Sequence, residues 1–287
     1  MKQLIKKLFN PTIAKVNTIE ILTRLDVALS RTAASFNRRI INETIPASWE
    51  CSGFSQNGED GIIDHLISKL KSSNRYFIEI GSNNGIENNT SYLAHVKKFS
   101  GLQIEGNMNQ YEIALKTKPW LVDCFNCFVK EPVIDTIIQR CLYKNPDVFS
   151  IDIDGMDYHI TRMLFEKGIR PKIVIVEYNS AFGPTNELTL PYNEHFDMFK
   201  TSFPYLYYGV SIQGWKKFFN KYGYQFVTVE TNGVNAFFID ATCFEPNFTS
   251  LIQGLSFEEN KHQLRVFKET WENQFEKISN LDFFQVP

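Results

Sequence analysis

Residues 77–85 read FIEIGSNNG, and residues 149–158 read FSIDIDGMDY. Each stretch is a short apolar run, rich in β-branched residues, that ends in carboxylates and glycine. Runs of this kind are typical of buried parallel strands, and open α/β sheets bind their ligands at the carboxyl ends of the strands. Acidic residues at those ends favour a ligand with hydroxyls, amines or a metal ion, and they disfavour a bare phosphate.

The chain around these two stretches alternates strands with helices from about residue 54 to residue 240, which predicts a parallel sheet with crossover helices. The predicted parallel strands are 76–80, 102–105, 121–127, 148–153 and 172–177, and the intervening segments 132–141 and 155–167 have helical spacing. An aromatic, proline-containing segment at 179–210 breaks this rhythm, and a long loop of this kind is usually functional. A helix at about 211–222 follows it.

The sheet is expected to end in an antiparallel pair. Asn232-Gly233 separates the β-rich runs 225–230 and 234–239, and Asn-Gly between two such runs is a strong hairpin signal. We therefore divide the chain into a helical, basic N-terminal extension (1–53), a central α/β domain (54–242) and a helical C-terminal extension (243–287).

The C-terminal extension is predicted to contain one long helix over residues 256–279. Ser256 and Glu259 fit a capping box at its start. An apolar stripe recurs three or four residues apart on one face, formed by Leu264, Phe267, Trp271, Phe275 and Ile278. Such a stripe is normally core packing, with a homodimer interface as the alternative.

Charge and hydropathy exclude several classes of protein. The net charge of −2 over 287 residues argues against a general nucleic-acid binder. No apolar run approaches the ~20 residues of a membrane span, so we expect a cytoplasmic protein. Residues 1–40 hold eight bases and two acids, a net +6. The segment 2–9 could lie on an anionic membrane as a peripheral contact, and a packed or frayed helix is the alternative.

The five cysteines are an odd number in a long chain, which argues against a disulfide framework. Cys124 and Cys127 lie in a predicted strand, where residues three apart face opposite sides of the sheet. We interpret them as buried thiols rather than as a metal site.

The turn after the first strand has the spacing Gly81-x-x-x-Gly85. Asn83 stands where a dinucleotide fold needs its second glycine, which disfavours a nicotinamide cofactor. Glu105 ends the next predicted strand, where a carboxylate can accept hydrogen bonds from both ribose hydroxyls. Together with Glu79, these features suit S-adenosylmethionine, an adenosine with a sulfonium and no phosphate. The alternative is an ordinary strand–turn–helix whose acids only cap or solvate.

A second group of acids is expected at the neighbouring strand ends. Asp152 and Asp154 alternate along a strand and share a face, and Glu177 ends the next strand. Clustered carboxylates repel one another unless a cation or a proton lies between them. Three explanations stay open: a divalent metal such as magnesium or manganese, the sulfonium of the cofactor beside Asp152, or a protonated acid–base group.

Other polar residues have both a structural and a functional interpretation. Asp154 and Asp157 could cap the helix that follows them. His159 comes just after the acidic turn and is a candidate general base, to be weighed against a histidine satisfied by its neighbours. Asn57 with Asp60 is expected to form the N-terminal cap of a helix that begins near residue 60.

The order of several motifs resembles FkbM-type S-adenosylmethionine-dependent methyltransferases over about residues 54–240. The matching motifs are SQNGEDG (55–61), EIGSNNG (79–85), SIDIDGMDY (150–158), VEYN (176–179), FGP (182–184), YG (208–209) and GVNAFF (233–238). The resemblance implies a class I methyltransferase, Rossmann-like α/β fold with a mostly parallel seven-stranded sheet of order 3-2-1-4-5-7-6. It also implies O-methylation of a sugar hydroxyl in a surface glycan or a related metabolite.

By position, the resemblance implies that the cofactor is bound by Glu79, Gly81, Asn83, Gly85 and Glu105. Asp152 and Glu177 also resemble the metal ligands of metal-dependent O-methyltransferases, whose catalytic lysine has no match here because Gly155 lies near its place. Asp154, His159 and Glu177 are the catalytic candidates, and Asp152, Asp154 and Glu177 are the metal candidates. The rival functions are a nicotinamide-dependent oxidoreductase and a non-catalytic cofactor-binding subunit.

Overall fold

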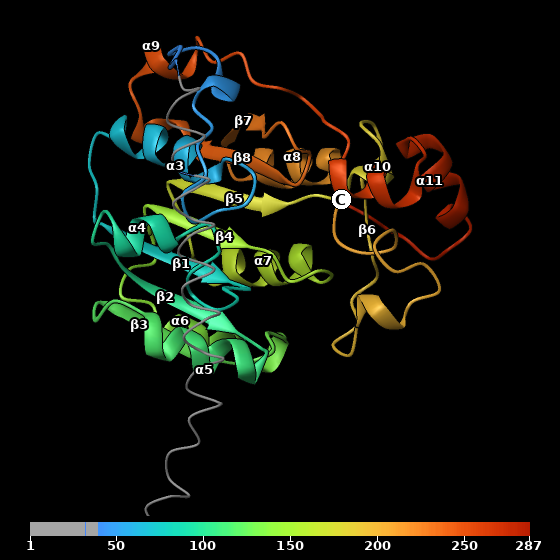
Figure 1. The fold of residues 1–287 in the computed structure, drawn as a ribbon, viewed down its shortest axis with the longest axis horizontal. Coiled ribbons are helices and arrows are strands. Elements are labelled where there is room, and N and C mark those ends of the chain that lie inside the picture. The colour runs from blue at the N-terminus through green and yellow to red at the C-terminus, as the bar shows by residue number, and fades with distance from the viewer. Residues whose placement is uncertain (1–31, 33–39) are drawn as a thin grey trace, which may run out of the picture.

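The computed structural model describes residue 32 and residues 40–287 (Figure 1). The basic segment 2–9 and most of the expected helical extension lie outside the described residues. Residues 40–53 are irregular apart from the short 3-10 helix η1 (Pro46–Ser48). Within the described part of the chain, no helix is both long and apolar enough to span a bilayer.

A seven-stranded sheet forms the centre of the protein, with the strand order β3-β2-β1-β4-β5-β8-β7 (Figure 1). Its strands are β1 (Tyr76–Ile80), β2 (Ser100–Glu105), β3 (Val122–Asn126), β4 (Val148–Ile151), β5 (Ile173–Glu177), β7 (Tyr224–Val229) and β8 (Asn235–Asp240). The first five are parallel, and β8 runs antiparallel to both β5 and β7.

The short strands β6 (Leu188–Thr189) and β9 (Phe284–Gln285) form a separate antiparallel pair. When β6 is left out of the count, the main sheet has the expected order 3-2-1-4-5-7-6. The class I methyltransferase fold predicted from the sequence is therefore confirmed, including the antiparallel hairpin at the sheet edge.

Helices cover both faces of the sheet because alternate strand residues point to opposite sides. One core lies under α3 (Glu59–Ser68), α4 (Ser91–His95) and α5 (Met108–Thr117), and it includes Phe77. The other core includes Ile78 and lies under α6 (Ile134–Arg140), α7 (Asp157–Glu166) and α8 (Ile212–Lys221). The remaining helices are α9 (Pro246–Thr249), α10 (Lys261–Phe267) and α11 (Trp271–Ile278).

The prediction of one long helix over 256–279 is wrong. The chain forms α10 and α11, and Lys268 ends α10 with the left-handed φ of 56°. Asn260 caps α10 by accepting the main-chain N–H groups of His262 and Gln263, so the expected capping box does not form. The break lets both short helices pack on the domain.

The apolar stripe of this segment packs against the rest of the chain, as expected for core residues. Ile278 is fully buried in the larger core, and Phe267 and Phe275 pack against that core. The homodimer alternative stays a prediction.

The prediction that Asn57 and Asp60 cap the first helix is also wrong. The helix α3 begins at Glu59, after Gly58 in a left-handed conformation, and no side chain caps it. Asp60 Oδ2 instead accepts hydrogen bonds from the main chain at residues 53–55. The carboxylate thus pins the preceding loop against the start of the helix, because a buried acceptor is satisfied best by several fixed N–H groups.

The two cysteines of the Cys-x-x-Cys sequence differ in environment. Cys124 is buried on β3, as expected, whereas Cys127 lies just past the end of the strand and is half-buried. The strand ends earlier than predicted, so the interpretation as a buried thiol is wrong for Cys127, which lines the large pocket described below.

Candidate functional site

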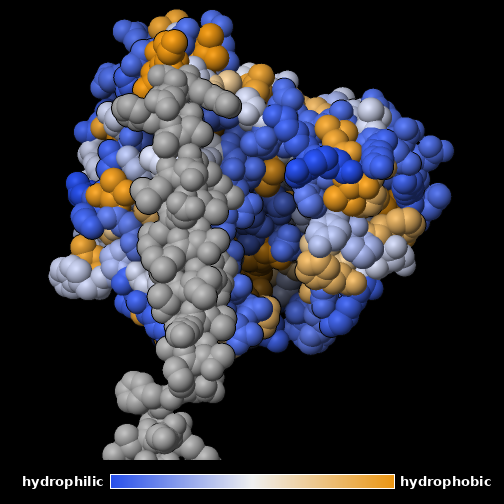
Figure 2. Space-filling view, viewed as in Figure 1, coloured by the Kyte–Doolittle hydropathy of each residue, from blue (hydrophilic) through white to orange (hydrophobic). Residues whose placement is uncertain are grey.

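A pocket of about 470 Å³ lies at the carboxyl ends of the strands, and its lining extends from the segment just after β3 at one side to the start of β8 at the other. In the space-filling view, this face of the molecule is hollowed beside the C-terminal part of the chain (Figure 2). The pocket spans the point between β1 and β4 where the strand order reverses. Open α/β sheets bind ligands at this switch point.

The turn after β1 approaches the loop after β4 very closely at Gly81. This residue has φ of 85°, and a Cβ there would lie 1.7 Å from the carbonyl oxygen of Asp152. Only glycine combines this backbone conformation with this contact. Gly81 therefore allows the two loops that frame the pocket to meet.

Glu79 is buried on β1 and organises the loop that follows the turn. Its carboxylate accepts a hydrogen bond from the main chain of Asn89 at 2.9 Å and another from the Thr90 hydroxyl at 2.6 Å. Burial raises the pKa of Glu79 to about 8. The structure thus places this predicted cofactor residue in the pocket wall, with both carboxylate oxygens engaged by the protein.

Glu105 ends β2 and connects to the turn after β1. Its Oε2 accepts the N–H of Asn83 at 2.7 Å, and its Oε1 accepts the N–H of Asn107 at 2.6 Å. Asn83 has a left-handed φ of 51°. Each carboxylate oxygen can accept a second hydrogen bond, so a ribose diol can still bind there. Burial raises the pKa of Glu105 above its ordinary value.

The pocket is strongly acidic. Its lining, within the residues that the structure describes, includes one lysine, Lys130, and seven carboxylates: Glu59, Glu79, Glu87, Glu105, Asp152, Asp154 and Glu194. A wall of this charge attracts cations and repels phosphate groups. The pocket is therefore poorly suited to a pyrophosphate-containing cofactor.

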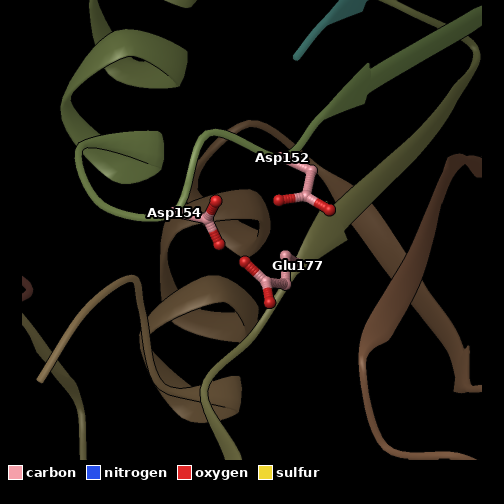
Figure 3. Close-up of side chains that lie close together, drawn as sticks. All are labelled: Asp152, Asp154 and Glu177. Carbon is pink, nitrogen blue, oxygen red and sulfur yellow. The ribbon is translucent and has the colours of Figure 1, made fainter. Parts of the chain in front are cut away.

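The structure brings the three predicted metal candidates together beside the pocket (Figure 3). One carboxylate oxygen from each of Asp152, Asp154 and Glu177 lies within 4.8 Å of the other two. Asp152 follows β4 and Glu177 ends β5, so strand pairing sets these two side by side. Asp154 comes from the following turn, where its φ is 54°.

The electrostatics of this cluster are those of acids held too close to ionise independently. Burial, and then the charges of the neighbouring carboxylates, raise the pKa of both Asp152 and Glu177 well above the ordinary range. The Tyr208 hydroxyl donates to Glu177 Oε1 at 3.1 Å. Such a pair needs a shared proton or a bound cation. In the sequence, residue 208 stands out only as part of the YG motif, because no local pattern indicates this hydrogen bond.

Asp157 fixes the turn that carries Asp154. Its carboxylate oxygens accept the N–H groups of Ile153 and Gly155, each at 2.9 Å. No side chain caps α7, so the predicted capping role of Asp154 and Asp157 is wrong. A Cβ at Gly155 would lie 2.4 Å from the ring of Phe196, which lines the opposite wall of the pocket.

His159 does not join the acid cluster. The side chain is buried on α7, and its Nε2 donates to the Leu190 carbonyl at 2.8 Å. Its ring lies against those of Tyr158, Tyr192 and Phe284, and the residue is absent from the pocket lining. The placement is that of a structural histidine and gives no support to the general-base prediction.

The segment 179–210 contributes to the pocket only in its middle. Tyr192, Asn193, Glu194 and Phe196 line the wall opposite the sheet. The start of the segment packs onto its end, because Asn179 Nδ2 donates to the carbonyls of residues 206 and 208. Of the long segment that was expected to be functional, only about five residues therefore line the pocket.

We expect the stability of the protein to fall as the pH rises from 6.5 to 8. Burial raises the pKa of both Glu79 and Glu230 to about 8, so the folded state holds protons that the unfolded state has released above its ordinary pKa of 4.5. The stabilisation present at low pH is then lost as the pH rises towards 8. The free energy of unfolding should drop by about 1–3 kcal/mol over this window, measured by urea denaturation.

Glu79→Gln should flatten this dependence, because its amide can still bond to residues 89 and 90 without titrating. The exposed Glu112→Gln on α5 is the matched control and should leave the slope unchanged. Burial lowers the pKa of His95 and His159, so these two groups act in the opposite direction, and their effect is confined to the lower end of the window, where the unfolded histidines still bind protons. A wild-type curve that is flat or rises between pH 6.5 and 8 contradicts the prediction.

No family model and no curated protein matches this sequence. Solved structures with a similar fold include the O-methyltransferase TomG of Streptomyces achromogenes in complex with SAM, at 18% identity over 60% of this chain and 73% of that chain, with a TM-score of 0.38. The SAH-bound methyltransferase PaMTH1 of Podospora anserina matches at 13% identity over 80% and 96% of the two chains, with a TM-score of 0.42.

An O-methyltransferase from Bacillus cereus in complex with SAH matches at 14% identity over 76% and 89% of the chains, with a TM-score of 0.39. Likeness at this level concerns the arrangement of strands and helices and does not extend to ligands or activity. The chain has the class I methyltransferase fold, and this assignment rests on its own strand order.

Proposed function

We propose that this protein is an S-adenosylmethionine-dependent O-methyltransferase of the cytoplasm that acts on a sugar hydroxyl of a surface glycan or a related metabolite. The observation that carries the proposal is the acidic pocket at the switch point between β1 and β4, with Glu105 at the end of β2. S-adenosylmethionine presents a ribose diol and a sulfonium, and it has no phosphate. The FkbM-type resemblance of the motifs in residues 54–240 supports the same function.

The cofactor would lie over the ends of β2, β1 and β4. Glu105 would accept the ribose hydroxyls, and the turn from Gly81 to Gly85 would allow close approach of the backbone. Asp152 would face the sulfonium side and stabilise its charge. Methyl transfer requires in-line approach of the acceptor oxygen, so positioning supplies much of the rate.

The acceptor hydroxyl would bind on the β5 side of the switch point, near Asp154 and Glu177. One of these carboxylates can accept the proton that the hydroxyl loses, because their environment raises the pKa of both groups. The oxygen-only cluster also fits a hard divalent ion such as magnesium or manganese. When bound, such an ion would acidify the hydroxyl.

Glu105→Ala is expected to weaken binding of S-adenosylhomocysteine by about tenfold to a hundredfold. Hydrogen bonds to a charged group contribute about 1.5–3 kcal/mol, which corresponds to that change in affinity. Isothermal calorimetry on the folded variant measures it, with the exposed Glu112→Ala on α5 as the control for charge alone. Unchanged affinity in Glu105→Ala would remove this residue from the site.

The same titration tests the proposed function itself. Wild-type protein should bind S-adenosylhomocysteine and show no binding of NADH at comparable concentrations. Binding of NADH in place of S-adenosylhomocysteine would reject the methyltransferase proposal in favour of an oxidoreductase.

A further inference from the structure

Asn235 continues the row of polar residues at the carboxyl ends of β4 and β5. As the first residue of β8, it pairs directly with Glu177 on β5. Residues directly opposite each other in an antiparallel pair point to the same face of the sheet. Asp152 follows Ile151, which pairs with Val176, so Asp152 shares the row and the face with Glu177. Asn235 also lines the same pocket as Asp152 and Asp154.

The side chain of Asn235 is held in one orientation by Glu59 at the start of α3. Its Nδ2 donates to Glu59 Oε1 at 2.8 Å, and Glu59 is itself fixed by the main-chain N–H and the side-chain amide of Asn57. A flipped amide would set Oδ1 against the Glu59 carboxylate and is therefore excluded. The orientation of the Asn235 amide is thus settled by its own hydrogen bond.

The Oδ1 atom of Asn235 is buried and has no hydrogen-bond partner among the described residues. The residue as a whole is only 3% exposed. A buried acceptor without a partner is costly, and it is rare in proteins unless a ligand or an ion satisfies it. A proton shared between Asp152 and Glu177 would leave the Asn235 oxygen without a partner. A cation bound jointly by this oxygen and the three carboxylates would satisfy all four groups.

The geometry points to Asn235 Oδ1 as a fourth oxygen ligand of a divalent cation held by Asp152, Asp154 and Glu177. Amide carbonyl oxygens belong with carboxylates to the ligand set that magnesium, manganese and calcium prefer. Glu59 is then a positioning residue, because it turns the carbonyl end of the amide away from itself. This inference rests on the pocket of the proposed function, and it assigns Asn235 a role that the three acids alone do not imply.

Two substitutions at residue 235 separate a ligand from a purely structural residue. Asn235→Leu removes both the oxygen and the donor to Glu59, whereas Asn235→Asp keeps an oxygen in the same place, removes the donor and adds a negative charge. If Asn235 is a ligand, the leucine variant should bind manganese at least tenfold more weakly. Substitution of residues around other metal sites causes losses of this size. Aspartate should preserve the affinity within about threefold or raise it.

The experiment is a titration of the full chain with Mn²⁺, followed by electron paramagnetic resonance of the free ion. Asn220→Leu, at an exposed position of α8 outside the pocket lining, is the matched control and should bind Mn²⁺ as the wild type does. Melting temperatures in EDTA show whether each variant is folded. Crystals soaked in Mn²⁺ give a second readout, since the anomalous peak should lie about 2.0–2.6 Å from Oδ1.

Four results would overturn the inference: no saturable Mn²⁺ binding by the wild type, unchanged binding in Asn235→Leu, equal loss in the leucine and aspartate variants, or an anomalous peak beyond ligand distance of Oδ1. If the leucine variant does not fold, the aspartate variant and the anomalous map decide. Calorimetry with S-adenosylhomocysteine in EDTA keeps the proposals apart: cofactor binding without Mn²⁺ binding rejects the cation site alone, and the reverse rejects the methyltransferase.

Discussion

Gly81→Ala is expected to lower the free energy of unfolding by about 3–5 kcal/mol and to reduce the affinity for S-adenosylhomocysteine more than tenfold. The added Cβ would lie 1.7 Å from the carbonyl oxygen of Asp152, so the turn after β1 and the loop after β4 must separate. Both loops line the pocket, and the displacement therefore changes the site as well as the stability. Urea denaturation and calorimetry measure the two effects.

Gly168→Ala is the matched control for this substitution. Gly168 has a similar left-handed φ of 93°, but a Cβ there would meet nothing within 4 Å. It should therefore show only the backbone strain of about 1–2 kcal/mol and leave ligand affinity unchanged. If the two alanine variants lose the same stability, the close approach of the two loops is not what requires glycine at residue 81.

Glu177→Gln is expected to weaken Mn²⁺ binding strongly and, in EDTA at pH 8, to stabilise the protein by about 1–3 kcal/mol. The gain arises because the amide removes one of two buried like charges and can donate a hydrogen bond to Asp152 in place of a shared proton. The Tyr208 hydroxyl keeps its acceptor in the glutamine. Loss of one charged ligand should weaken Mn²⁺ binding roughly a hundredfold or more.

Asp154→Asn provides the comparison for Glu177→Gln. Asp154 lies on an exposed turn where water screens its charge, so its substitution should weaken Mn²⁺ binding with little gain in stability. Urea denaturation in EDTA and the Mn²⁺ titration separate the two contributions. A destabilised Glu177→Gln variant in EDTA would show that the carboxylate pair is not repulsive in the folded protein.

The positions of the strands and the convergence of the acids follow from local sequence patterns, whereas the order of the strands was implied by the resemblance to FkbM-type methyltransferases. Parallel strands of four to six residues are signalled by apolar runs such as Phe77–Ile80, and Asn232-Gly233 signals the hairpin at the sheet edge. Because the carboxyl ends of parallel strands meet at one edge, acids that end neighbouring strands must lie close together. Asp152 and Glu177 could thus be placed side by side without any tertiary contact being known.

The break at Lys268 and the true start of α3 depended on contacts that the local pattern does not contain. A helical period over 256–279 is compatible with one helix or with two. Two short helices allow Phe267, Phe275 and Ile278 to pack on the core. Likewise Asp60 resembles a capping residue by position, yet it bonds to the loop that folds back over it.

The sequence by itself determined the fold class and the acidic character of the site, because both follow from short patterns read along neighbouring strands. Only the tertiary structure decided which polar groups are satisfied. His159 is buried away from the pocket, Asp157 bonds to the turn that carries Asp154, and Asn235 lies beside Glu177 with an oxygen that has no partner within the described part of the chain. These outcomes depend on pairings between residues up to 176 positions apart, such as Glu59 with Asn235, which no local pattern encodes.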